Sequence, residues 1–240
     1  VLLIILFKRI ERPKIFKLLR PFPGKDMLSL LKIGIPSAFE SFNYNLSQLV
    51  VTAIVLNFLT QTELITKTYV SNIAMFFYIF TVSIGQGAQI LVGHKVGARD
   101  FDGAYKQGLR AFSTAFIISM SLSLLGILLR YQLMALFTKD PTVISAGAIL
   151  IILNIFVEAG RTSNIIIISS LRGAGDVIFP TGVAIFSMWI LSTLCGYVLA
   201  VVLGMGLNGL WIAFAADECF RGVLMLWRWK TGKWRLKRLA

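Results

Sequence analysis

Six long apolar stretches alternate along the chain with short polar or glycine-containing segments. They fall at residues 30–59, 69–93, 111–129, 142–171, 177–203 and 207–227. Each is long enough for a helix to cross about 30 Å of hydrocarbon, which takes about 20 residues. The stretches at 69–93, 111–129 and 177–203 contain no charged residue at all. The pattern predicts an all-α membrane protein built as a six-helix transmembrane bundle.

Glycines mark several of the breaks between these stretches. The segment Gly204–Gly209 matches the G-x-G-x-x-G motif, but dinucleotide sites place that motif directly after a β-strand. Here it separates two apolar stretches, so we interpret it as a tight turn. Gly93 and Gly97 have the spacing of a helix-packing site. Because this pair straddles a predicted helix end, we expect a turn there as well.

Composition supports a membrane protein and offers little for catalysis. Hydrophobic residues make up 57% of the 240 residues and charged residues 15%, whereas soluble proteins average about half and about a quarter. Cys195 and Cys219 lack metal-ligand spacing, and His94 is the only histidine. The sequence contains no nucleophile elbow and no phosphate loop. We therefore expect no catalytic residues, no enzyme activity and no bound cofactor.

The positive charges are distributed unevenly between the two sides of the predicted bundle. The chain has 24 Lys and Arg against 11 Asp and Glu, a net charge of +13. Nineteen of the 24 precede or lie at the start of the first stretch, follow the second or fourth, or close the chain, whereas only Lys67, Arg130 and Lys139 lie on the other side. The positive-inside rule then places both ends of the segment in the cytoplasm. The aromatic and basic run after residue 227 is interpreted as an anchor on anionic lipid, and no nucleic-acid partner is expected.

The same pattern divides the chain into four segments. Residues 1–7 are apolar and are interpreted as the tail of a preceding transmembrane helix. Residues 8–29 form a basic cytoplasmic connector, residues 30–227 the six-helix lobe, and residues 228–240 a basic cytoplasmic tail. On this interpretation the chain is part of a longer protein.

Six ionisable residues fall within or close to the apolar stretches, where each costs about 2.5 to 3.5 kcal/mol unless it is paired or hydrated. They are Glu40, Glu158, Arg161, Asp217, Glu218 and Arg221. Glu158 with Arg161 and Asp217 with Arg221 have the spacing of pairs within one helix. Four acids against two arginines leave two excess negative charges, which we expect to bind a cation or protons. The spacing does not decide whether Asp217 or Glu218 faces the interior.

Polar residues recur at helical spacing near these charges and are expected to line a cavity between helices. The predicted lining comprises Asn43, Tyr44, Gln48, Asn72, Gln86 and Asn154. Their amide and hydroxyl oxygens, together with carboxylates, suit a hard cation.

Several segments resemble the C-terminal lobe of bacterial multidrug and toxic compound extrusion (MATE) transporters. They occur in the family's order and cover the chain nearly end to end: Ile33–Ser41, Gly85–Gln89, Gly93–Ala98, Glu158–Asn164, Leu171–Asp176 and Gly206–Trp211. The resemblance implies helices seven to twelve of a twelve-helix antiporter in the bacterial plasma (inner) membrane. The implied partners are the lipid bilayer, small organic cations and an N-terminal lobe.

The resemblance also implies a coupling mechanism. Glu40 matches a seventh-helix acid and Glu158 a tenth-helix acid that bind the coupling cation, Na⁺ or H⁺, in some members. We expect Glu40 and Glu158 to bind this ion, assisted by Asp217, with no other metal site. Asn154 stands one turn before Glu158, where some members carry an aromatic hydroxyl. Phe39, Phe42, Tyr44 and Phe76 are expected to contact the rings of the exported drug.

Two alternatives remain open. A lipid-linked precursor flippase of the same superfamily would have the same helix count, but its cavity would favour basic residues for a pyrophosphate. An intramembrane enzyme would need a compact His/Asp or Ser/His set, and the only histidine is predicted to lie in a loop.

Overall fold

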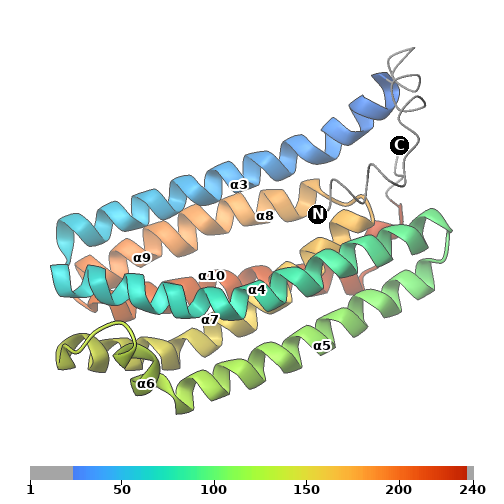
Figure 1. Ribbon diagram of the computed structural model, residues 1–240. Coiled ribbons are helices and arrows are strands. Elements are labelled where there is room, and N and C mark those ends of the chain that lie inside the picture. Colours follow the sequence, from blue (N-terminus) through green and yellow to red (C-terminus); the bar gives the residue numbers. More distant parts are fainter. Residues whose placement is uncertain (1–23, 237–240) are drawn as a thin grey trace, which may run out of the picture.

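The computed structural model describes residues 24–236, which are helical throughout apart from short turns (Figure 1). Its elements are α3 (Gly24–Phe58), α4 (Gln61–Gly97), α5 (Phe101–Leu128), α6 (Arg130–Ala135), α7 (Pro141–Gly173), α8 (Ile178–Ser187), η1 (Met188–Leu194), α9 (Cys195–Tyr197), η2 (Val198–Val202), α10 (Gly206–Lys230) and η3 (Lys233–Leu236). The π-helical segments η1 and η2 continue α8 and α9, so Ile178–Val202 acts as one long helix.

The six predicted stretches correspond to α3, α4, α5, α7, the α8–η2 helix and α10. Among the described residues, α4, α5, α7 and Ile178–Val202 are long and apolar enough to cross a membrane by length and composition. The predicted boundary at residue 30 differs from the structure, because α3 begins at Gly24 and residues 24–29 of the predicted connector belong to it. Residues 1–7 and 8–23 lie outside the described residues, as does the end of the tail at 237–240.

Helix α7 lies at the centre of the bundle and packs against α4, α5 and α10, whereas α3 lies along α8 and η1 at one side (Figure 1). Glycines allow the closest approaches. A Cβ added at Gly160 of α7 would lie 2.4 Å from the backbone nitrogen of Cys219 on α10. A Cβ added at Gly173 would lie 2.4 Å from the carbonyl oxygen of Gln89 on α4. The backbones of α7, α4 and α10 are therefore close enough for polar side chains to meet between them.

Two glycine predictions have different outcomes. Gly204 and Gly206 adopt positive φ angles of 66° and 56° between η2 and α10, so the predicted tight turn is confirmed. The turn expected at Gly93 is wrong, because α4 continues to Gly97. Gly93 instead faces Gly173, whose carbonyl oxygen lies 3.4 Å from an added Cβ. Its role is the helix packing that its spacing also allowed.

The aromatic run at the end of α10 packs inward. Trp229 and Trp234 are 0% and 1% exposed, and their rings stack with centroids 4.4 Å apart. The Trp234 indole N–H donates to the carbonyl oxygen of Trp229 at 3.0 Å. The lipid-anchor interpretation is therefore wrong for these two rings. Trp227 is 49% exposed, and for this ring the lipid anchor stays a prediction. The aromatic pair fastens the segment after α10 onto the bundle.

Polar caps define the ends of the helices outside the apolar stretches. Asp100 accepts a hydrogen bond from the N–H of Gly103 at the start of α5 and pairs with the Lys95 ammonium at 3.1 Å. These two partners lower the pKa of the Asp100 carboxyl below its ordinary value. At the start of α7, the capping residue is Asp140, and hydrogen bonds from the hydroxyl and N–H of Thr142 lower the pKa of its carboxyl. Each carboxylate is thus favoured in the charged form that complements a helix N-terminus.

Candidate functional site

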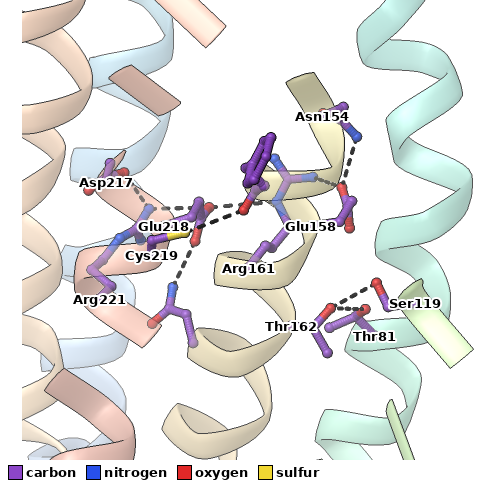
Figure 2. Close-up of polar contacts among 12 residues, drawn as sticks. Thr81, Ser119, Asn154, Glu158, Arg161, Thr162, Asp217, Glu218, Cys219 and Arg221 are labelled. Carbon is purple, nitrogen blue, oxygen red and sulfur yellow. Dashed lines mark hydrogen bonds and ion pairs between the residues drawn. The ribbon is translucent and has the colours of Figure 1, made fainter. Parts of the chain in front are cut away.

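A cluster of five ionisable side chains lies between α7 and α10, where Gly160 brings the two helices close together (Figure 2). Glu158 and Arg161 project from α7, and Asp217, Glu218 and Arg221 project from α10. The Glu158 side chain is 0% exposed, and those of Asp217, Glu218 and Arg221 are 4%, 11% and 6% exposed. Arg161 is the most exposed member, with 20% of its side chain accessible.

The arginines link the acids into one network. The Arg161 Nη1 atom lies 2.7 Å from Glu158 Oε1, and its Nε atom lies 3.6 Å from Glu218 Oε1. The Arg221 Nη2 atom lies 2.6 Å from Asp217 Oδ2 and 3.2 Å from Glu218 Oε1. Both pairs predicted within single helices are therefore confirmed. The contact between Arg161 and Glu218 joins the two helices.

Two asparagines extend the network with neutral hydrogen bonds. Asn154 donates to Glu158 Oε1 at 3.4 Å and accepts from the Trp211 indole N–H at 3.4 Å. Asn164 donates to Glu218 Oε2 at 3.1 Å. Sequence reasoning included Asn154 but missed Asn164. A residue three positions after Arg161 on the same helix was the available indication.

Three buried hydroxyls, one each from α4, α5 and α7, meet one helical turn beyond Glu158 (Figure 2). Thr162 donates to Ser119 of α5 at 2.9 Å, and its hydroxyl lies 3.3 Å from that of Thr81 on α4. Because the helical spacing places Thr162 one turn after Glu158, this group continues the polar face of α7. It ties α7 to both neighbouring helices.

The charge of the cluster does not balance. Glu158, Asp217 and Glu218 set against Arg161 and Arg221 leave one excess negative charge when all five are ionised. The Glu158 Oε2 atom is buried and has no hydrogen-bond partner. A bare carboxylate oxygen is costly in a low-dielectric interior. The cluster therefore favours the uptake of one further positive charge near Glu158.

Glu40 belongs to a different group of side chains. Its Oε2 atom lies 2.7 Å from Arg172 Nη2 and accepts the Thr181 hydroxyl at 3.1 Å. Arg172 lies 14 residues after Glu158 on α7, which is about 20 Å along the helix axis. The structure thus does not bring Glu40 and Glu158 together. Because Arg172 neutralises Glu40, the predicted excess of two negative charges falls to one. The coupling roles of Glu40, Glu158 and Asp217 remain predictions.

Sequence reasoning missed this pairing because Arg172 was counted among the cytoplasmic charges. It is in fact the last basic residue of α7, and its long side chain reaches back to α3. The structure also distinguishes Asp217 from Glu218, which the spacing in the sequence did not. Glu218 contacts both arginines, whereas Asp217 contacts only Arg221 among the ion pairs of residues 24–236.

The predicted polar lining divides between interior and surface. Asn154 is buried, and so is Asn43, which accepts a hydrogen bond from the Trp189 indole N–H at 3.3 Å. Gln48 is partly exposed, whereas Tyr44, Asn72 and Gln86 are exposed. The aromatic residues Phe39, Phe42 and Phe76 are also exposed. The exposed set lies on α3 and α4 and is accessible from outside the bundle.

Within residues 24–236, no three His, Cys, Asp or Glu side chains converge in the manner of a metal site. The carboxylate oxygens best placed to meet a cation are Glu158 Oε2 and Asp217 Oδ1, because both are buried and have no hydrogen-bond partner. His94 is exposed near the end of α4.

Comparison with known proteins agrees with the family resemblance found in the sequence. The MatE family model matches residues 36–198. The uncharacterized transporter YisQ of Bacillus subtilis is 41% identical over 239 residues, covering 100% of this chain and 52% of that protein. The multidrug resistance protein NorM of Vibrio cholerae is 25% identical over 224 residues, covering 89% of this chain and 49% of that protein. The chain spans about half the length of the curated relatives it matches.

Solved structures share the fold at low sequence identity. A MOP superfamily transporter from Pyrococcus furiosus superposes with a TM-score of 0.81 at 17% identity, over 92% of this chain and 50% of that one. An outward-facing MATE family transporter gives 0.78 at 17% identity, over 88% and 48%. The six-helix bundle is therefore the architecture of one half of such transporters.

Proposed function

Because this chain belongs to the MATE family, we propose that it is the C-terminal lobe of a multidrug efflux antiporter. The transporter exports small organic cations in exchange for Na⁺ or H⁺ by alternating access. It spans the plasma membrane of a bacterium, with both ends of this segment in the cytoplasm. A second lobe of the same transporter completes the central cavity.

The observation that carries this proposal is the charge imbalance of the buried cluster. Glu158 is fully buried with one unpartnered oxygen, and the cluster holds one more acid than arginine. Intramembrane charges of this kind are expensive and usually belong to ion or substrate pathways. An inert bundle would have no need of them.

The proposed mechanism uses this imbalance as a switch. Binding of the coupling ion neutralises Glu158 and changes which helix arrangement is more stable. Asp217 assists by holding Arg221 in place. Glu40 acts at the α3 end of the same cycle, where its bond to Arg172 links α3 to α7. A cationic drug bound along the exposed faces of α3 and α4 is then released on the opposite side.

The alternatives receive less support. A flippase for a lipid pyrophosphate would need unpaired cations in the cavity, but Arg161 and Arg221 are both paired with carboxylates. An intramembrane enzyme would need a nucleophile beside a base, and His94 lies at the surface near a helix end.

The test is gradient-driven uptake of a fluorescent organic cation such as ethidium into inverted vesicles containing the full-length transporter, in which export from the cytoplasmic face becomes uptake. Glu158→Gln should abolish gradient-driven transport while the protein remains inserted, because the amide cannot exchange an ion. Glu40→Gln should do the same. Asp102→Asn is the control, since its side chain is 82% exposed on the surface. Full uptake by Glu158→Gln would refute the assignment of the site, and no uptake by the wild type would refute the function.

A further inference from the structure

We propose that Arg161 is a built-in cation that takes the place of a sodium ion in this cluster. While Arg161 bridges Glu158 and Glu218, this lobe binds no Na⁺ between them. The inference builds on the proposed function by stating which coupling ion the cluster does not accept.

The position of Arg161 is that of a bridging ion. Its guanidinium contacts carboxylates from two different helices, at 2.7 Å to Glu158 and 3.6 Å to Glu218. A monovalent metal ion that neutralised the same two acids would have to lie between the same oxygens. Arg161 supplies the same single positive charge, but it is covalently part of the protein and always protonated.

Most carboxylate oxygens of the cluster are already occupied. Glu158 Oε1 accepts from Arg161 and Asn154, Glu218 Oε1 faces both arginines, and Glu218 Oε2 accepts from Asn164. Only Glu158 Oε2 and Asp217 Oδ1 are buried carboxylate oxygens of the cluster without a partner. Asn154 presents its amide nitrogen, and not its oxygen, to Glu158. Because a hard cation needs several oxygens at once, the cluster lacks a coordination shell while Arg161 is present.

Arg161 differs from Arg221 in its exposure and in the helices that it joins. Arg221 contacts acids of its own helix and has 6% of its side chain exposed. Arg161 has 20% exposed and lies 5.9 Å from the centre of the Tyr78 ring on α4. Its removal would leave Glu158 without an ion pair, whereas Glu218 Oε1 would keep Arg221 at 3.2 Å. Arg161 is therefore the residue whose loss should create a sodium site.

The experiment measures Na⁺ binding to the purified full-length transporter through tryptophan fluorescence. Trp211 is a natural reporter, because its N–H bonds to Asn154, which in turn bonds to Glu158. NaCl is titrated against choline chloride at constant ionic strength. The wild type should give no saturable Na⁺ response. Arg161→Ala should gain one, with an affinity at least about tenfold higher than any wild-type response.

Three variants make the result specific. Arg161→Ala/Glu158→Gln should lose the response again, and Arg161→Lys should stay silent because it keeps the charge. Arg228→Ala is the matched control. It removes an arginine from its pair with buried Asp176 at the end of the bundle, away from the cluster, and should also stay silent.

Two results would overturn the inference. One is a saturable Na⁺ response of the wild type that Glu158→Gln abolishes, which needs no arginine variant to fold. The other is a folded Arg161→Ala protein without any Na⁺ response. Sodium-driven drug efflux by the wild type that needs Glu158 would refute this inference while supporting the proposed function. A silent wild type that exports no drug would refute the function and leave the inference standing.

Discussion

The ion pair between Glu40 and Arg172 should be a main attachment of α3 to the rest of the bundle. The two side chains are 14% and 23% exposed, and their closest atoms are 2.7 Å apart. Charges about 4 Å apart attract by about 4 kcal/mol at an effective dielectric constant of about 20. Exposed pairs contribute about 0.2–1 kcal/mol, whereas removal of one partner from a buried pair costs about 3–5 kcal/mol. With intermediate exposure, we expect a coupling energy of about 2 kcal/mol.

The neighbouring contacts explain why α3 should remain bound without this pair. Asn43 and Ser47 lie on the same face of α3 as Glu40, at the i+3 and i+7 positions. Asn43 accepts from Trp189, and the Ser47 hydroxyl lies 2.9 Å from that of Thr193. Loss of the ion pair should therefore weaken the attachment of α3 without detaching it.

A double-mutant cycle measures the coupling. Glu40→Gln, Arg172→Gln and the double variant are unfolded by titration with SDS in mixed micelles, and unfolding is followed by tryptophan fluorescence. The loss of unfolding free energy in the double variant should be smaller than the sum of the two single losses by about 2 kcal/mol. Lys230→Gln, at an exposed position, is the control. A coupling below about 0.5 kcal/mol would refute the reasoning, because independent sites already add to within that margin.

Three further predictions concern packing and capping. Gly160→Val should prevent α7 and α10 from closing and strongly reduce the folded yield in size-exclusion chromatography, because an added Cβ would lie 2.4 Å from a backbone nitrogen; Gly182→Ala, with nothing within 4 Å, should have no such effect. Trp234→Ala should lower the free energy of unfolding by about 3 kcal/mol or more, whereas Trp227→Ala, at a 49% exposed side chain, should change it much less. Because the pKa of Asp100 is lowered in the folded state, its capping contribution should be complete above the ordinary aspartate pKa and disappear as the pH falls through the lower folded value. The thermal stability advantage of the wild type over Asp100→Asn should therefore shrink in acid, and an advantage that grew in acid would contradict the assignment.

The sequence alone determined the helices and much of the chemistry within each one. Six apolar stretches led to six long helices, four of which are long and apolar enough to cross a membrane within the described residues, because hydrocarbon length and backbone hydrogen bonding constrain each segment by itself. The pairs Glu158–Arg161 and Asp217–Arg221 followed from spacing on one helix, and both occur. The turn at Gly204–Gly206 also followed from local geometry, since positive φ favours glycine.

Only the tertiary structure decided which helices share their charges. It paired Glu40 with Arg172 instead of bringing it to Glu158, joined Arg161 to Glu218, and buried Trp229 and Trp234 in a stack. Each of these contacts depends on how far one helix is rotated and shifted against another. That placement is set by close backbone contacts at a few glycines and by packing across the whole interface. Periodicity along one helix contains no information about it.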